Sequence, residues 1–163
     1  MAGERTFLVA DVNALLIAEP TVESRPILDT DLRDVAQTLV DASNGTTGGE
    51  MTIDVASALI MELMSGSTGE PHRPTWLGVW EGTGPPASVV LCTKWRGMPF
   101  IASVASAPAV QNRGYASSLV REAAAVFHAG GDTHIGLSVE RDNPAMHLFN
   151  ELGFKEMFST ALL

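Results

Sequence analysis

The pattern of apolar and polar positions divides the chain into short strands and amphipathic helices. Apolar residues recur at intervals of three and four over 29–39 and 52–64, which predicts two early helices. A third helical pattern follows the segment 111–116, runs to about residue 128 and ends at a pair of glycines. A shorter final helix is expected over 143–153, where an asparagine precedes a proline and a glycine ends the pattern.

Short apolar runs between turn-forming residues predict the strands. They are expected at 25–28, 75–80, 87–93, 100–106 and 134–140, with one terminal strand after Phe154. The order is therefore strand, two helices, a three-strand meander, helix, strand, helix and strand. Periodicity alone leaves the order of the strands within the sheet open.

Residues 1–22 precede the first segment that the pattern places. Their apolar positions fit a strand or a short helix equally well, and we expect an N-terminal extension that packs on the outside of a single domain over 1–163. Only nine residues follow Phe154, which leaves room for one strand. We therefore expect the edge of the sheet to be completed by a partner chain, in a homodimer, or by the N-terminal extension.

The charge of the chain narrows the range of partners. The chain has 19 acidic and 10 basic residues and a net charge of −9, which argues against nucleic acid, because that partner needs a basic surface. The acidity is compatible with a cationic acceptor such as an amine.

The cysteine content and the apolar runs bear on the compartment. The lone Cys92 excludes an internal disulfide and fits a reducing compartment, and its apolar surroundings indicate a buried, inert thiol. No apolar stretch is long enough to span a bilayer, and the run over 7–18 is interrupted by Asp11 and Asn13, unlike a secretory signal. We expect a cytoplasmic protein with no membrane partner.

A phosphate-binding turn is predicted where the strand at 100–106 meets the third helix. The turn reads Gln111-Asn-Arg-Gly114-Tyr-Ala116. Free amide groups in a first helical turn, together with the helix dipole, attract anions. Gly114 lets the backbone approach a bulky anion, and the small Ala116 keeps a second approach open.

Two segments resemble the GNAT N-acetyltransferases, which use acetyl-CoA. The spacing Gln-x-x-Gly-x-Ala over 111–116 resembles their pyrophosphate loop, and Leu137 to Phe154 resembles their later segment, in which a strand ends near an asparagine and Gly-Phe closes a short helix. The two matches lie in the family's order and together span 100–154. The resemblance implies an α/β GNAT fold, with a mixed central sheet of about six to seven strands flanked by about four helices.

The resemblance also implies a set of acetyl-CoA contacts. Three strand residues would pair with the pantetheine arm, six loop residues would hold the pyrophosphate, and two later residues would lie by the arm and the thioester. These are Val104, Ala105 and Ser106; Gln111, Asn112, Arg113, Gly114, Tyr115 and Ala116; and Asn143 and Phe149. Asn143 also fits a plain helix cap, and both roles are compatible.

The catalytic groups depart from the family pattern. Many relatives carry a tyrosine acid in the last helix, where this chain has Phe149, and a glutamate on the strand before the loop, where this chain has none. Glu140, at the end of the neighbouring strand, is the best candidate for a catalytic base, with a solvated surface carboxylate as the alternative. The four histidines lack metal-ligand spacing, so no metal is predicted.

The sequence therefore favours an acyltransferase enzyme that moves an acetyl group from acetyl-CoA to an amine by direct attack. The acceptor class (small amine, peptide N-terminus or lysine) stays open. The missing tyrosine and glutamate leave a second hypothesis, an acetyl-CoA-binding sensor or assembly module with weak catalysis. A different nucleotide-binding α/β protein is a third, against which the absence of Gly-x-Gly-x-x-Gly and Gly-Lys-Ser/Thr turns argues.

Overall fold

A computed structural model of the chain describes residues 4–44 and 51–157. In this described part, eight strands form one mixed sheet in the order β2-β4-β5-β6-β7-β1-β8, and β3 pairs with β5 off this path. The strands are β1 (Arg5–Asp11), β2 (Arg25–Pro26), β3 (Glu70–Pro71), β4 (Leu77–Val79), β5 (Ser88–Trp95), β6 (Met98–Ser106), β7 (His134–Glu140) and β8 (Lys155–Met157). All neighbouring pairs are antiparallel except β6 and β7.

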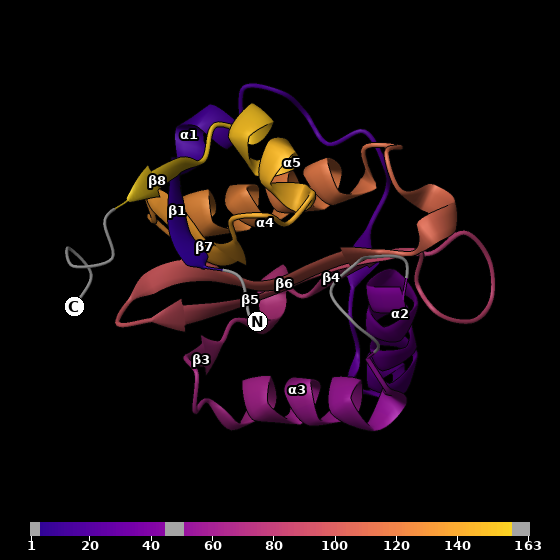
Figure 1. Ribbon diagram of the computed structural model, residues 1–163. Coiled ribbons are helices and arrows are strands. Elements are labelled where there is room, and N and C mark those ends of the chain that lie inside the picture. Colours follow the sequence, from indigo (N-terminus) through magenta and orange to yellow (C-terminus); the bar gives the residue numbers. More distant parts are fainter. Residues whose placement is uncertain (1–3, 45–50, 158–163) are drawn as a thin grey trace.

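Helices cover both faces of the sheet (Figure 1). On one face lie α1 (Val12–Leu15), α4 (Tyr115–Ala129) and α5 (Ala145–Leu152), and on the other lie α2 (Leu32–Asn44) and α3 (Ile53–Ser65). Three 3-10 turns, η1 (Asp29–Asp31), η2 (Arg73–Thr75) and η3 (Pro108–Val110), join elements. None of the helices within 4–44 and 51–157 is long and apolar enough to cross a membrane.

Each layer of helices has its own apolar core against the sheet. The core under α4 includes Leu119 and Phe127, which are almost fully buried, and the core under α2 and α3 includes Val35, Ile60 and Trp76. The residues spaced three and four apart in each helix point into these cores. Burial of both faces explains why the central strand β5 is apolar on both sides.

The predicted α/β class and mixed sheet are confirmed, with small differences in the elements. The strand expected at 75–80 is shorter, because a 3-10 turn over Arg73–Thr75 occupies its beginning. The described residues contain eight strands and five α-helices, slightly more than expected. The additions are the two-residue β3 and the N-terminal pair β1 and α1.

The expectation that the N-terminal segment packs on the outside is wrong. Strand β1 lies inside the sheet, between β7 and β8 and antiparallel to both. Its alternate residues Thr6, Leu8 and Ala10 are buried. This burial of one face of β1 is the physical reason why the segment is a sheet strand. The alternative in which the N-terminal segment adds to the sheet is therefore confirmed, and the homodimer stays a prediction.

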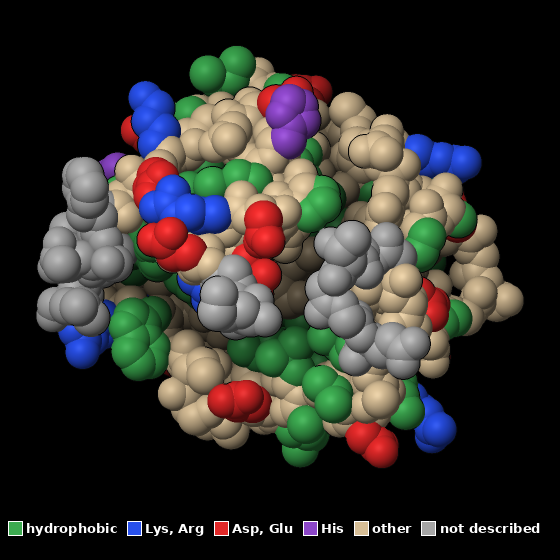
Figure 2. Space-filling view, in the orientation of Figure 1, with side chains coloured by type: hydrophobic (Ala, Val, Ile, Leu, Met, Phe, Trp, Pro, Cys, Tyr) green, Lys and Arg blue, Asp and Glu red, His purple; other side chains and the backbone are tan. Residues whose placement is uncertain are grey.

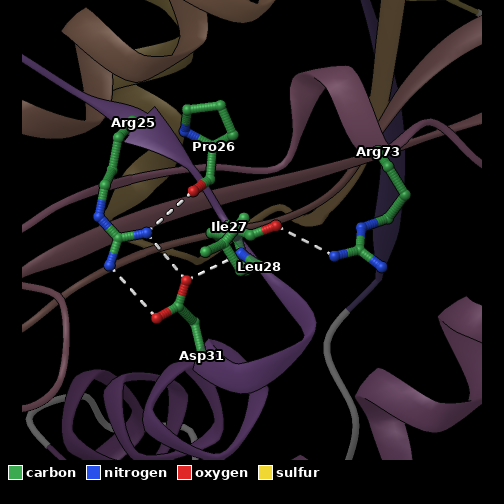
Figure 3. Close-up of polar contacts among 6 residues, drawn as sticks. All are labelled: Arg25, Pro26, Ile27, Leu28, Asp31 and Arg73. Atoms are coloured by element: carbon green, nitrogen blue, oxygen red, sulfur yellow. Dashed lines mark hydrogen bonds and ion pairs between the residues drawn. The ribbon is translucent and has the colours of Figure 1, made fainter.

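Ion pairs fix the other edge of the sheet, at β2 (Figure 3). Both Nη atoms of Arg25 donate to the carboxylate of Asp31, at 2.9 and 3.2 Å, and hold the pKa of that carboxyl below its usual value. The same carboxylate accepts from the Leu28 amide at 2.8 Å, while Arg73 donates to the Ile27 carbonyl at 3.0 Å. These contacts fasten the segment between β2 and α2 to the sheet.

Candidate active site

Strands β6 and β7 run parallel but stay paired for only two positions. Phe100 is paired with Gly136 and Ile101 with Leu137, and the strands then separate. The register between β5 and β6 shifts at this point, which leaves Ala102 as an extra residue on β6. A bulge of this kind bends a strand and increases its twist, so it accounts for the separation.

A groove of about 200 Å³ lies between the separated strands. Its walls come from β6, β7 and the start of α5, and its lining residues are Ile101, Ala102, Ser103, Val104, Leu137, Ser138, Val139, Asn143, Ala145 and Phe149. In Figure 2, the face of the molecule below α5 is hollowed near its centre. An opening in the middle of a sheet leaves main-chain N–H and C=O groups without a neighbouring strand. A bound molecule can form hydrogen bonds with these groups.

The predicted strand residues lie along the β6 side of this groove. Val104 lines the groove, and Ala105 and Ser106 continue the same strand toward the phosphate turn. On the opposite edge of β6, the Ser88 hydroxyl donates to the Ala105 carbonyl at 3.0 Å and lies 2.8 Å from the Ser106 hydroxyl. Hydrogen bonds therefore hold β6 to β5, while its other edge beyond Ile101 is unpaired with β7.

The predicted phosphate turn lies where β6 passes into α4, and its backbone is unusual. Asn112 and Gly114 have φ angles of 66° and 82°, in the left-handed region that glycine adopts most readily. The Gln111 side chain donates to the Ser106 carbonyl at 3.2 Å and ties the turn to the strand. The Arg113 amide is used internally, in a 3.3 Å bond to the Val110 carbonyl.

The amides of the first turn of α4 are open. Among residues 4–44 and 51–157, the amides of Gly114, Tyr115 and Ala116 donate to no acceptor. The first helical bond at this end runs from the Ser118 amide to the Gly114 carbonyl, at 3.0 Å. Helix α4 thus begins with donors directed outward at a positive helix end, which is an arrangement suited to an anion.

Asn143 and Phe149 lie at the opposite wall of the groove. The Asn143 side chain accepts from the Ala145 amide at 2.8 Å, so it caps α5 and also lines the groove. Phe149 is buried against Phe154, with ring centroids 5.7 Å apart, and one side of it lines the groove. Both interpretations of Asn143 are compatible with this placement.

The candidate base Glu140 lies at the end of β7, outside the lining of the groove. Its side chain is 41% exposed, and its Oε1 atom lies 3.9 Å from Nη1 of Arg5, on β1. Arg5 also donates to Ser138, which does line the groove. Sequence reasoning missed Arg5, because only the position of β1 beside β7 brings it to the site.

Two further residues reach the phosphate turn from other segments. The Tyr115 hydroxyl donates to the carboxylate of Glu81, in the loop between β4 and β5, and this bond raises the pKa of Tyr115. Thr21 lies on the segment between α1 and β2, which Ser118 holds by accepting from the Thr21 and Val22 amides at 3.0 and 3.2 Å. The turn is therefore surrounded by the N-terminal segment and the β4–β5 loop.

Two other candidate chemistries find no support in the described residues. Cys92 is fully buried, and burial raises its pKa to about 12, so its thiol stays protonated and unreactive. The ranges 4–44 and 51–157 contain no group of three or more His, Cys, Asp or Glu residues that could hold a metal ion.

Comparison with known proteins bears directly on this arrangement. The FR47-like protein family model matches residues 77–163, a little over half of the chain. The chain belongs to the FR47-like family. The matched region contains the groove, the phosphate turn and α5, whereas β1, α1, α2 and α3 lie outside it. No curated protein matches the chain.

Solved structures show the fold of this FR47-like protein. The GCN5-related N-acetyltransferase of Sphaerobacter thermophilus is 20% identical, with a TM-score of 0.69 over 96% of this chain and 49% of its own. A Staphylococcus epidermidis protein of unknown function is 15% identical, with a TM-score of 0.67 over 95% and 58%. The chain thus spans about half of the first protein and somewhat under three fifths of the second.

A smaller enzyme has the same fold. The apo aminoglycoside 6'-N-acetyltransferase of Acinetobacter haemolyticus is 15% identical, with a TM-score of 0.60 over 85% of this chain and 94% of its own. At these identities the likeness shows the fold alone. The predicted GNAT fold is confirmed, and the chemistry rests on the residues of the site.

Proposed function

We propose that this protein transfers an acetyl group from acetyl-CoA to an amine. The observation that carries the proposal is the set of open amides at Gly114, Tyr115 and Ala116, in the turn that follows β6, one wall of the groove. A diphosphate needs several donors at once, and a helix N-terminus with a glycine turn supplies them. Membership of the FR47-like family and the fold of N-acetyltransferases support the same function.

In this proposal the cosubstrate lies along the free edge of β6. The diphosphate binds over 111–116, with Arg113 beside it, and the pantetheine arm pairs with main-chain groups of 104–106 as an added strand would. Asn143 and Phe149 then flank the thioester end. The groove between β6 and β7 is the space into which the arm and the acetyl group extend.

The reaction needs little covalent chemistry from the protein. The amine nitrogen forms a bond to the thioester carbonyl carbon, and the carbon–sulfur bond breaks to release coenzyme A. A thiolate leaves readily, because its conjugate acid has a pKa of about 8.5. The amine must lose a proton, since its own pKa is near 10. In this proposal Glu140 accepts that proton, directly or through water. The groove holds the amine close to the thioester.

One observation favours the second candidate function, an acetyl-CoA sensor. The ten residues that line the groove carry no charged side chain, and Glu140 lies outside the lining. A protein with the cofactor cradle but without a well-placed base would bind acetyl-CoA and turn it over slowly.

One experiment tests the proposal and separates it from this alternative. Purified protein is mixed with acetyl-CoA and a panel of amines, and the released coenzyme A thiol is measured, while calorimetry measures acetyl-CoA binding. We expect micromolar binding and amine-dependent thiol release. Binding without release on any amine would favour the sensor, and an absence of binding would refute both functions.

A further inference from the structure

One charged side chain contacts the β7 wall of the groove, and it belongs to the N-terminal strand β1. Among the described residues, Arg5 is the one charged side chain that hydrogen-bonds to a lining residue. Its Nε atom donates to the Ser138 hydroxyl at 3.1 Å, and its Nη2 atom donates to the Ser138 carbonyl at 3.0 Å. The guanidinium is therefore anchored directly on the β7 wall.

The pairing of β1 with β7 shows which way that carbonyl points. The Arg141 amide donates to the Glu4 carbonyl at 2.8 Å, so these two residues form a hydrogen-bonded pair of the antiparallel ladder. Pairs alternate in type, and Phe7 and Ser138 are three positions farther along, so they form a non-hydrogen-bonded pair. The main-chain groups of Ser138 thus point away from β1, toward the groove. Arg5 binds a carbonyl that belongs to the groove wall.

The same guanidinium retains donors for a ligand. Two hydrogen bonds use two of its five N–H groups. The nearest carboxylate, Glu140, lies 3.9 Å from Nη1, which is too far for a hydrogen bond. The two side chains are 58% and 41% exposed. They therefore present a cation and an anion side by side to solvent, with bonding capacity left on each.

We propose that the acceptor is an amine whose own carbon bears a carboxylate, that is, an amino acid. This inference rests on the proposed acetyl transfer. Arg5 binds the carboxylate through its free N–H groups, since a guanidinium fork matches a carboxylate in shape and charge. Glu140 faces the ammonium group and accepts its proton before attack on the thioester. The amine then forms the new carbon–nitrogen bond, the carbon–sulfur bond breaks, and the second proton that the nitrogen loses passes to the sulfur, so that coenzyme A leaves as the thiol.

A second arginine, Arg141, lies one position beyond Glu140 and on the opposite face of the sheet, and its contacts are purely structural. Arg141 lies 3.5 Å from Glu4 and makes two hydrogen bonds to Glu156, so its carboxylate partners are already bound. Its side chain forms no hydrogen bond to a lining residue of the groove. Arg141 is thus a control for Arg5 that is matched in charge and similar in exposure.

The test compares amino acids with their amides and decarboxylated amines. Thiol release is measured for the twenty amino acids, the matching amino acid amides and the matching simple amines, in the full chain and in Arg5→Gln and Arg141→Gln. We expect the native protein to prefer amino acids in kcat/KM. Arg5→Gln should lower kcat/KM for amino acids at least tenfold, mainly through KM, and leave the simple amines within about twofold. Arg141→Gln should change neither.

Acetyl-CoA binding, measured by calorimetry on each variant, separates the two proposals. Loss of amino-acid preference with intact acetyl-CoA binding and intact simple-amine turnover supports the assignment. An equal loss on both acceptor classes, or a native preference for the amides or simple amines, would overturn it and leave acetyl transfer standing. Acetyl-CoA binding with no acceptor turned over would overturn both, and thermal melting checks that each variant is folded.

Discussion

Helices α4 and α5 follow β6 and β7, the two strands that border the groove, and their N-termini are built differently. At α5, the Asn143 side chain accepts from the Ala145 amide at 2.8 Å, and at α3, away from the groove, Thr52 accepts from the Val55 amide at 3.2 Å. At α4, no side chain caps the helix, and the preceding residue is Gly114. In α3 and α5 a side chain therefore accepts from one first-turn amide, whereas no side chain does so at α4.

The difference has an energetic side. A side-chain cap stabilises a helix by about 1 kcal/mol, which α4 lacks. Its stability comes instead from packing, since Leu119, Val120 and Phe127 are almost fully buried. Apolar burial of that kind contributes several times as much as a cap. An uncapped N-terminus is therefore tolerated on a well-buried helix, where it keeps donors available for an anion.

The largest effect is expected from a bulky side chain that blocks the unpaired amides at the N-terminus of α4. Gly114→Trp should lower acetyl-CoA affinity at least a hundredfold, because the indole would occupy the diphosphate position. A Cβ added at Gly114 would meet no atom closer than the Thr21 hydroxyl, at 3.9 Å, so the variant should fold, with about 1 to 2 kcal/mol lost to the positive φ of 82°. Calorimetry with acetyl-CoA measures the effect.

A glycine at the other end of α4 provides the control for that substitution. Gly131 has a φ of 93°, and nothing lies within 4 Å of a Cβ added there. Gly131→Trp should lose a similar amount of stability and keep acetyl-CoA binding. Normal binding by Gly114→Trp would mean that the loop assignment is wrong.

A smaller effect is expected at the capped end. Asn143→Ala should lower the free energy of unfolding by about 1 kcal/mol and acetyl-CoA affinity by about tenfold, because Asn143 both caps α5 and lines the groove. Thr52→Ala removes a comparable cap on α3 and should lower stability alone. Chemical denaturation and calorimetry separate the two quantities. If both variants bind acetyl-CoA with equal affinity, Asn143 acts as a helix cap and has no role in binding.

A charge beside the open helix end should matter less than the amides themselves. Arg113→Ala should weaken acetyl-CoA binding by about threefold to tenfold in low salt, and the difference should shrink as salt rises. Arg96→Ala, on the left-handed turn between β5 and β6, removes the same charge far from the phosphate turn. If both substitutions weaken binding equally, the effect is one of net charge, and Arg113 has no local role.

The smallest expected effect is on the pH dependence of stability, through His72, which packs against Phe127 of α4. The His72 ring lies 4.6 Å from the Phe127 ring, and burial together with the Lys94 charge lowers its pKa. Below about pH 6.5 the unfolded chain takes up the proton more readily than the folded one, so stability should fall as pH drops through that range. His72→Gln should melt with a weaker dependence between pH 7 and 5. The exposed His134→Gln is the control, and identical pH dependence in the three proteins would contradict the assignment.

Much of the site could be predicted from local sequence. Gln111 to Ala116 predicted a glycine turn at a helix start, and that turn is present with Gly114 in the left-handed region. Asn143 predicted a cap, and it caps α5. The acceptor side could not be predicted, because Arg5 and Glu140 are 135 positions apart and meet only through the pairing of β1 with β7. The roles of these residues toward acetyl-CoA stay predictions.

The sequence by itself determined the elements whose signals are local: the amphipathic helices, the caps, the glycine turn and the strand that precedes it. Such signals act between residues a few positions apart, so they can be interpreted without knowledge of the fold. Only the tertiary structure decided that β1 lies between β7 and β8, that β6 and β7 separate at the Ala102 bulge, and that Arg5 binds the Ser138 carbonyl. These features depend on how all the strands and helices pack around the two hydrophobic cores, so no short segment of the sequence determines them.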